Sequence, residues 1–285
     1  MRELTLKSPA KLNLYLDLLN KREDGFYNIL TLFERIDLSD VITFRENFSG
    51  KVKIRCSAPE ISEKNNLVYR ITKILKKDFS VSKGVDIFIE KRIPLSAGLA
   101  GGSSNAAFTL LGLNRFWNLK LKRTELLSYA RKIGSDVSFF VSRNSFALGL
   151  GRGDKILPLD IKRKFWHVLV LPKIKVSTKT IYERYRPSLR EKTSLGRLIF
   201  ALKDKSLPKK NLLSNALEKT TERYFKVIRE SRKILESFKI KAITMSGSGP
   251  AIFGIVSARK EGEKICRQLK YRFGDAFSIF LAKTF

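Results

Sequence analysis

Cysteine and histidine are almost missing from this sequence. Its 285 residues include two cysteines, Cys56 and Cys266, and a single histidine, His167. Two thiols far apart in the sequence do not form a disulfide framework, and the sequence has no cluster of Cys and His residues that could bind zinc. The histidine lies in the apolar run 165–171, where a strand residue is expected rather than a member of a catalytic triad. These scarcities exclude disulfide-rich domains, zinc proteins and histidine-based hydrolases.

Long uncharged runs are missing as well. No stretch reaches the roughly 20 apolar residues that a membrane helix needs. The first 19 residues are interrupted by Glu3, Lys7, Lys11 and Asp17, so they do not have the pattern of a signal peptide. We therefore expect a cytoplasmic protein with reduced thiols and no membrane contact.

Acidic residues are scarce relative to basic ones. The chain has 27 Asp and Glu against 57 Lys and Arg, a formal net charge of +30. Such an excess favours anionic partners, and nucleic acid is the first class to consider because Lys and Arg neutralise its phosphates. The charge is diffuse, however, and basic residues are interleaved with acids along nearly the whole chain. We interpret it as a solvated, lysine-rich surface that attracts anionic substrates, with RNA binding as an alternative.

Apolar periodicity predicts a mixture of strands and helices. In the first half we expect strands at 12–18, 41–44, 52–56 and 85–90, helices at 66–75 and 124–133, and a glycine-rich hairpin at 146–159. In the second half we expect strands at 166–171, 243–245, 251–256 and 277–281, and a helix over 212–238. Such a mixture is typical of an α+β protein with an antiparallel sheet in its second half.

The clearest functional signal is the segment 91–107, KRIPLSAGLAGGSSNAA. It follows the strand at 85–90, and its glycines allow the backbone to curl with the N–H groups turned inward. Ser103 and Ser104 are good N-cap residues for the helix that follows, so the positive end of that helix lies directly behind the loop. This arrangement favours a phosphate site over a turn needed only for packing. The sequence is neither a Walker loop nor a dinucleotide fingerprint, because the Lys-Ser or Lys-Thr pair and the glycine spacing are missing.

Two other places carry polar residues of catalytic type. Lys11 and Asn13 alternate with leucines and therefore lie on the same face of their strand. Asp136 opens the apolar segment 137–140. By spacing alone, the first pair also fits an ordinary exposed face, and the aspartate fits an acid placed at a helix N-terminus.

Four segments, in order along the chain, resemble the signature motifs of the GHMP small-molecule kinases. Residues 94–104 match P-x-x-x-G-L-x-G-G-S-S without a gap, and residues 8–14 match S-P-A-K-L-N-L. Residues 134–140 match G-[AS]-D-V-x-F-F, and residues 246–250 resemble the third glycine motif of the family. Residues 215–218 resemble a further family signature. The resemblance therefore extends over nearly the whole chain.

The resemblance implies a two-domain fold and a kinase activity. We expect an N-terminal ATP-binding domain with a mixed sheet and helices over residues 1–160, and a C-terminal ferredoxin-like α/β sandwich over residues 161–285. The implied cofactors are ATP and Mg²⁺. Within the family, the chain is similar to the branch that phosphorylates the 2-hydroxyl of 4-diphosphocytidyl-2-C-methyl-D-erythritol in non-mevalonate isoprenoid biosynthesis. The implied partner is this cytidyl diphosphate substrate rather than nucleic acid, for a monomer or weak homodimer.

The resemblance also assigns roles to residues. Asp136 is the implied catalytic carboxylate, and Lys11 offsets the charge that develops on the transferred phosphoryl group. The implied nucleotide-binding residues are Asn66, Lys91, Pro94, Leu95, Ser96, Ala97, Gly98, Leu99, Ala100, Gly101, Gly102, Ser103 and Ser104, and of the two serines Ser104 is assigned to Mg²⁺. The implied acceptor-binding residues are Asn13, Phe26, Tyr27, Phe33, Thr178, Tyr182, Gly247, Ser248 and Gly249, with Phe26 and Tyr182 stacking on the cytosine.

One position departs from the branch. Tyr27 stands where the branch has a histidine that reads the cytosine, and a phenol hydroxyl reaches farther and with different geometry than an imidazole. Another GHMP acceptor, such as homoserine, mevalonate or a sugar, is therefore an alternative, as is an RNA-binding protein on the same scaffold.

Overall fold

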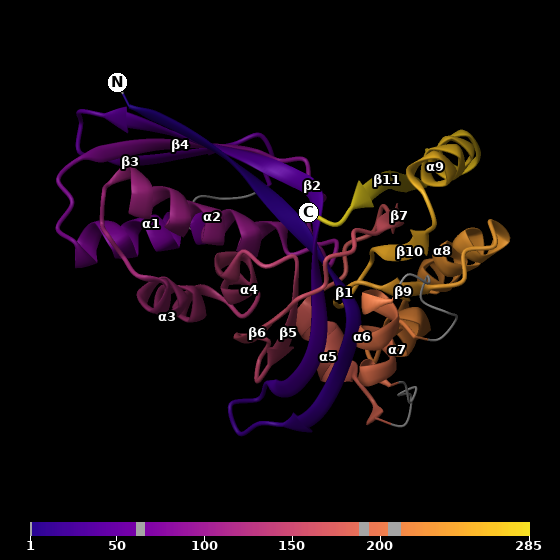
Figure 1. Ribbon diagram of the computed structural model, residues 1–285. Coiled ribbons are helices and arrows are strands. Elements are labelled where there is room, and N and C mark those ends of the chain that lie inside the picture. The colour runs from indigo at the N-terminus through magenta and orange to yellow at the C-terminus, as the bar shows by residue number, and fades with distance from the viewer. Residues whose placement is uncertain (1, 61–65, 188–193, 205–211) are drawn as a thin grey trace.

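The computed structural model describes residues 2–60, 66–187, 194–204 and 212–285 (Figure 1). Two sheets organise these residues, one of seven strands and one of four. Figure 1 shows the first sheet with its helices on the left and the second sheet with its helices on the right.

A long antiparallel hairpin forms the middle of the first sheet. Its strands are β1 (Glu3–Lys21) and β2 (Tyr27–Asn47), which run diagonally through the molecule in Figure 1. The strands predicted at 12–18 and 41–44 are therefore parts of much longer ones. The other strands of this sheet are β3 (Val52–Cys56), β4 (Gly84–Glu90), β5 (Phe146–Leu150), β6 (Lys155–Leu159) and β8 (Ser214–Asn215).

Residues 8–18 of β1 are all buried, on both faces of the strand. One face packs in the first half of the molecule, while leucines such as Leu16 and Leu18 belong to a core cluster shared with the second sheet. The polar residues that alternate with these leucines therefore lie inside the protein. Burial on both faces favours the functional interpretation of Lys11 and Asn13 over an ordinary exposed face.

Four helices pack against the first sheet on one side in Figure 1. They are α1 (Leu67–Asp78), α2 (Gly101–Phe116), α3 (Arg123–Ile133) and α4 (Val137–Ser142). The start of α2 differs from the prediction that Ser103 or Ser104 caps it. Ala100, in the left-handed conformation with φ 54°, turns the chain so that the helix begins at Gly101, and Ser104 lies buried in the first turn.

The second sheet has the strand order β11-β7-β10-β9, with antiparallel neighbours throughout. Its strands are β7 (Trp166–Pro172), β9 (Ile243–Met245), β10 (Ile252–Val256) and β11 (Phe277–Lys283). In Figure 1, α8 (Lys226–Ser237) and α9 (Arg259–Phe273) cover its outer side. This order along the chain is that of a ferredoxin-like sandwich, which confirms the expected fold.

The connection between β7 and β9 holds three more helices in the described residues. These are α5 (Thr178–Arg184), α6 (Leu195–Lys203) and α7 (Glu218–Tyr224). The single helix predicted over 212–238 is wrong: β8 precedes α7, and Phe225, with φ −133° and ψ 89°, separates α7 from α8. Apolar spacing alone does not reveal such a break.

The boundary expected at residue 160 falls between β6 and β7, although β8, which follows it along the chain, joins the first sheet. A buried polar cluster joins the sheets close to this point. His167 Nε2 lies 2.9 Å from Glu34 Oε1, and both side chains are fully buried. Thr284 Oγ1 donates to the same Glu34 oxygen over 2.5 Å and accepts from Phe165 N over 2.7 Å. His167 is therefore a structural residue of β7.

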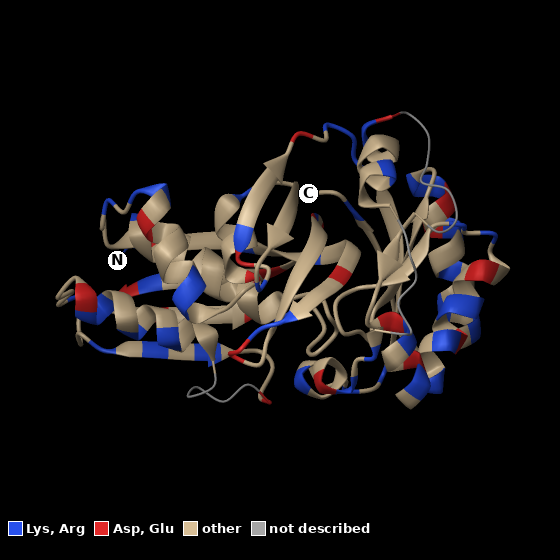
Figure 2. Ribbon diagram, turned by 90° about the horizontal axis from the view of Figure 1, so that it is seen from below, with Lys and Arg blue, Asp and Glu red and all other residues tan. Residues whose placement is uncertain are grey.

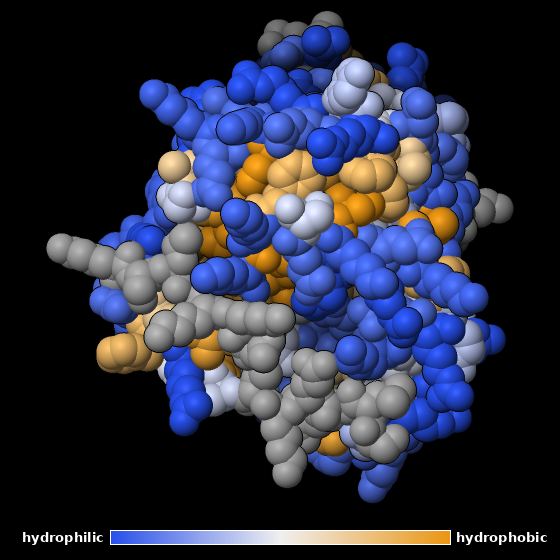
Figure 3. Space-filling view, turned by 90° about the vertical axis from the view of Figure 1, so that its right-hand side faces the viewer, coloured by the Kyte–Doolittle hydropathy of each residue, from blue (hydrophilic) through white to orange (hydrophobic). Residues whose placement is uncertain are grey.

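The excess of basic residues is spread over the surface. Figure 2 shows Lys and Arg on the outer helices at both ends of the molecule, mixed with Asp and Glu. The face seen in Figure 3 is mostly hydrophilic around an apolar strip. Within the described ranges, no helix has the length and apolar character to span a bilayer. The distribution favours a solvated surface as the interpretation of the +30 charge.

We predict that His167→Ala lowers the free energy of unfolding by about 1–3 kcal/mol, because it leaves a buried carboxylate of Glu34 with one partner fewer. His167→Gln, which keeps a hydrogen-bonding group, should lose less. Urea denaturation of the two variants checks this. Equal stability of His167→Ala and the unmodified protein would contradict a role for this pair in joining the sheets.

Candidate active site

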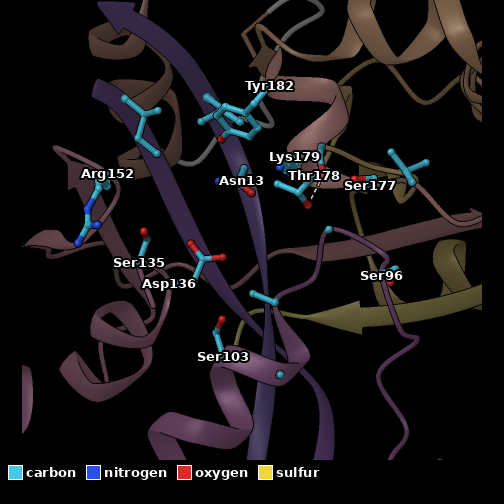
Figure 4. Close-up of a pocket in the computed structure, with 18 of the residues that line it drawn as sticks. Asn13, Ser96, Ser103, Ser135, Asp136, Arg152, Ser177, Thr178, Lys179 and Tyr182 are labelled. Atoms are coloured by element: carbon cyan, nitrogen blue, oxygen red, sulfur yellow. Dashed lines mark hydrogen bonds between the residues drawn. The ribbon is translucent and has the colours of Figure 1, made fainter. Parts of the chain in front are cut away.

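A cavity of about 960 Å³ lies where the two halves of the molecule meet. It is bounded by β1, the loop before α2, the start of α4, the β5–β6 hairpin, α5 and the turn at 246–249. Figure 4 shows Asp136 near its centre between Ser135 and Ser103, with Asn13 above. Thr178, Lys179 and Tyr182 reach it from α5. Segments far apart in the sequence therefore converge on one site.

Most of the predicted site residues line this cavity. They are Lys11, Asn13, Phe26, Tyr27, Phe33, Lys91, Pro94, Leu95, Ser96, Ala97, Gly98, Ala100, Gly101, Gly102, Ser103, Asp136, Thr178, Tyr182, Gly247 and Ser248. Four predicted residues lie outside its lining: Asn66, Leu99, Ser104 and Gly249. Asn66 instead caps α1, accepting a hydrogen bond from Val68 N.

Several lining residues were not predicted from the sequence. The charged and hydroxylic ones are Lys21, Asp24, Ser135, Arg152, Ser177, Lys179 and Glu183. Arg152 lies in the glycine-rich hairpin predicted at 146–159, and Ser135 precedes Asp136 in the motif 134–140. Their positions in these segments could have indicated that they belong to the site. Lys179 and Glu183 follow Thr178 on α5, and nothing local distinguishes them from surface charges.

The first glycine loop adopts a strained, tightly packed path. Gly98 has φ +75°, and a Cβ there would lie 2.1 Å from the carbonyl oxygen of Ser246. Ser96 and Ala100 also have positive φ, at 52° and 54°. After this curl, α2 begins at Gly101, and the amides of its first turn have no partner within the helix. They lie at the cavity with the positive end of the helix, as an anion site requires.

The second glycine turn, residues 246–249, packs against the first loop. Ser246 Oγ donates to Gly98 O over 2.9 Å and accepts from Asn13 N over 3.2 Å. A Cβ at Gly247 would lie 3.3 Å from Gly98 O. The turn is also tied to α5, since the hydroxyls of Ser248 and Thr178 are 2.9 Å apart. The two glycine motifs therefore approach each other closely.

Lys11 and Asp136 form the ionic centre of the cavity. Lys11 Nζ lies 3.7 Å from Asp136 Oδ2 and donates to Asn13 Oδ1. Lys11 is 4% exposed, and burial lowers the pKa of its ammonium, while the Asp136 carboxylate opposes that shift. Asp136 stands at the N-terminus of α4, but its side chain makes no capping hydrogen bond. Apart from its ion pair with Lys11, the carboxylate lines the cavity, where a bound hydroxyl can approach it.

Aromatic rings line the part of the cavity bordered by β2 and α5. Tyr27 contacts Tyr182, with ring centroids 6.3 Å apart, and Tyr185, at 5.7 Å. Burial raises the pKa of Tyr182, so its hydroxyl stays protonated. Phe26 is 56% exposed, and the Arg152 guanidinium lies 5.7 Å from the centre of its ring. The ring in contact with Tyr182 is thus Tyr27.

Phe33 has a different place from the other rings. It is 1% exposed and stacks on Phe139 with centroids 4.9 Å apart. Lys11 Nζ lies 5.5 Å from the centre of the Phe33 ring. Phe33 therefore forms part of the cavity floor beneath the lysine.

The residues predicted to hold metal and nucleotide differ in whether they reach the cavity. Ser104 is fully buried, and its hydroxyl accepts a hydrogen bond from Ser8 Oγ over 2.8 Å, whereas Ser103 lines the cavity. Lys91 pairs with Asp40 below the loop and donates to Asn105 Oδ1 over 3.2 Å. Among the residues described, no group of three or more His, Cys, Asp or Glu could hold a metal ion. The Ser103 hydroxyl offers one oxygen, which suits Mg²⁺ that takes its other ligands from phosphates and water.

Comparison with known families identifies the family of this chain. Residues 66–144 match the model described as GHMP kinases N terminal domain, and residues 193–275 match GHMP kinases C terminal. The chain belongs to the GHMP kinase family.

Curated relatives show which members of the family this chain is similar to. The 4-diphosphocytidyl-2-C-methyl-D-erythritol kinase of Shouchella clausii is 36% identical over 282 residues, covering 98% of this chain and 95% of the relative. The enzyme of that name from Bacillus subtilis is 38% identical over 266 residues, covering 93% and 92%. These relatives confirm the resemblance found in the sequence.

Solved structures agree in fold. A crystal structure of 4-(cytidine 5′-diphospho)-2C-methyl-D-erythritol kinase superposes with a TM-score of 0.84 at 28% identity, covering 98% of both chains. A homoserine kinase from Cytophaga hutchinsonii gives 0.69 at 16% identity and covers 99% of this chain and 94% of its own. The second likeness shows the shared fold alone.

We predict that Gly98→Ala destabilises the protein by about 1–3 kcal/mol, the range expected for backbone strain. An alanine at this positive φ also meets the backbone of Ser246. Gly102→Ala is the matched control, because a Cβ there meets no atom within 4 Å and alanine favours a helix. Thermal unfolding checks the pair, and equal melting temperatures would contradict the tight packing of the two glycine motifs.

Proposed function

We propose that this protein uses ATP to phosphorylate the 2-hydroxyl of 4-diphosphocytidyl-2-C-methyl-D-erythritol. The observation that carries the proposal is the pairing of Lys11 with Asp136 in the cavity that the first turn of α2 also lines. A proton acceptor, a buried cation and a phosphate cradle in one cavity are the parts that phosphoryl transfer needs. The relatives described above support this acceptor within the family.

ATP is the phosphate donor of this kinase family. The amides at the start of α2 hold its phosphates, and the loop 94–100 encloses them. The Ser103 hydroxyl would hold Mg²⁺ together with the ATP phosphates and water, and the ion would neutralise charge on the phosphates. Ser104 supports this turn from behind through its contact with Ser8. In this assignment Ser103 replaces Ser104 as the metal-facing serine.

The transfer itself depends on two side chains. Asp136 orients the acceptor hydroxyl and receives its proton. Lys11 lies beside the transferred group and stabilises the charge that develops on it, in surroundings where burial strengthens electrostatic interactions. Asn13 accepts a hydrogen bond from Lys11 and donates to Thr31 Oγ1 over 2.8 Å, which holds the lysine in place.

The acceptor occupies the aromatic part of the cavity. Tyr182, Tyr27 and Phe26 offer ring faces to the cytosine, a type of contact worth about 1–3 kcal/mol per base. The Tyr27 hydroxyl takes over the hydrogen bonding of the family histidine. Arg152, beside Phe26, adds a positive charge for the diphosphate. Thr178, Gly247 and Ser248 also line the cavity and approach the acceptor.

Other parts of the proposal follow the family expectation. The protein acts in non-mevalonate isoprenoid biosynthesis, in the cytoplasm, as a monomer or weak homodimer that binds no nucleic acid. Homoserine and mevalonate kinases share its fold at 13–16% identity, so a different acceptor is the second candidate. The specific observation that favours testing a different acceptor is that Tyr27 stands in place of the family histidine.

We predict that Asp136→Asn and Lys11→Ala each lower turnover by at least about 100-fold, in line with the usual size of general acid–base contributions. Because burial lowers the pKa of Lys11, activity should fall on the alkaline side at a lower pH than an ordinary lysine would give. Lys11→Arg should shift this limb to higher pH, since arginine stays charged. Steady-state rates of the three variants and the unmodified protein from pH 6 to 10 measure these effects. Near-normal turnover in both Asp136→Asn and Lys11→Ala would rule out the Lys11–Asp136 pair as the catalytic centre.

We predict that Tyr27→Phe raises KM for the cytidyl substrate and leaves KM for ATP unchanged, because only the hydroxyl is lost. Tyr185→Phe is the matched control, since Tyr185 contacts Tyr27 but does not line the cavity. Equal changes in both KM values for Tyr27→Phe would show that Tyr27 is a packing residue.

A further inference from the structure

Asn215 lies behind the second glycine turn, outside the cavity lining. It is 7% exposed, and its side-chain amide is nearly fully used. Nδ2 donates to Met245 O and to Gly247 O, both at 2.7 Å. Oδ1 accepts from Leu217 N over 2.9 Å, at the start of α7. One side chain therefore fixes the backbone at Met245, where the chain enters the turn, and at Gly247, within the turn.

The backbone of the same residue is tied to the strand that carries Lys11. Asn215 pairs with Leu16 in the parallel β1–β8 ladder, and Ala216 N donates to Leu16 O over 2.8 Å. Lys11 and Asn13 precede Leu16 on β1. Asn215 thus links the strand bearing these two residues to the turn that faces them.

Peptide geometry shows what the side chain controls. In a trans peptide the C=O and the following N–H point in opposite directions. Because Gly247 O points to Asn215, the N–H of Ser248 points away from it. The neighbouring peptide follows the same rule: Met245 O is bound to Asn215, and Ser246 N donates to Ala251 O over 2.9 Å.

The Ser248 amide is available to a ligand. Within the described part of the chain it has no hydrogen-bond acceptor, and Ser248 lines the cavity while Asn215 does not. Its hydroxyl is fixed by Thr178 at 2.9 Å. An amide N–H held in this way suits an anionic oxygen of a phosphate group.

We propose that Asn215 is a positioning residue for the phosphoryl transfer, acting by fixing the peptide that presents the Ser248 amide to the phosphate groups of the bound acceptor. This inference rests on the proposed function. The effect is indirect, since Asn215 touches the turn and β1 rather than the ligand. A misplaced donor in a reaction that depends on orientation costs much in rate even when folding is intact.

The test compares Asn215→Asp and Asn215→Ala with Thr244→Val. Asp keeps the size but turns a carboxylate oxygen toward two carbonyl groups, and Ala removes the amide without adding charge. Thr244 is the control because it is 1% exposed on β9, the strand that leads into the turn, and its hydroxyl donates to Glu218 Oε2 over 3.0 Å without reaching the turn. Each variant loses at least one hydrogen bond of a buried side chain, so all three should melt at lower temperature.

Steady-state kinetics with Mg-ATP and the cytidyl substrate distinguish positioning from simple destabilisation. We expect both Asn215 variants to lower kcat at least tenfold and to raise KM for the acceptor, with KM for ATP within about threefold of normal. Thr244→Val should keep normal kinetics at a temperature where it is folded. Asn215 variants with kcat within threefold of normal, or a matching loss in Thr244→Val, would overturn the inference.

Failure of the proposed function is distinguishable from failure of this inference. If the unmodified protein phosphorylates no cytidyl substrate, the proposed function is contradicted. Amide hydrogen exchange then tests Asn215 alone: its variants should speed exchange across residues 246–251 at least tenfold, and Thr244→Val should not. Unchanged exchange there would overturn the positioning role regardless of turnover.

Discussion

The contact between the two glycine motifs is the constraint on which the site depends. Gly98 and the 246–249 turn approach so closely that a single added carbon at Gly98 would overlap a backbone oxygen. The hydrogen bond from Ser246 to Gly98 O, and that from Asn13 to Ser246, place the phosphate loop, β1 and the second sheet in one fixed relation. Glycine is required here by close approach and by positive φ together.

Burial of polar groups follows from the same arrangement. The second half of the molecule covers the face of β1 that an isolated sheet would expose, so Lys11 and Asn13 are enclosed. An enclosed ammonium loses hydration, which lowers its pKa and strengthens its attraction to charge in the cavity. The interface that shapes the fold thereby also sets the chemistry of the lysine.

Much of the fold and site could be predicted from the sequence. The glycine loop is visible because its conformation is local: small residues follow a strand and precede a helix. Asp136 and Lys11 have no such local signal, and only the family motifs identified them. The ferredoxin-like order of the second sheet followed from the resemblance rather than from periodicity.

Other features depend on distant parts of the chain. The length of β1 and β2 is set by strands that pair with them across the sheet, and the break at Phe225 within the predicted helix leaves no mark on apolar spacing. Ser103 and Ser104 differ by one position, and the left-handed turn at Ala100 decides which faces the cavity. Arg152 comes from the turn between β5 and β6 and Lys179 from α5, so the two line one cavity only because the halves of the molecule pack together.

The most direct test of the central claim is the acceptor preference of the purified protein. ADP release from Mg-ATP should be measured separately with the cytidyl methylerythritol substrate, its uridyl analogue, homoserine and mevalonate. We predict turnover with the cytidyl compound alone, with Tyr27 serving in place of the family histidine. Preference for homoserine or mevalonate would contradict the proposed acceptor. No ADP release with any of the four compounds would contradict the proposed activity.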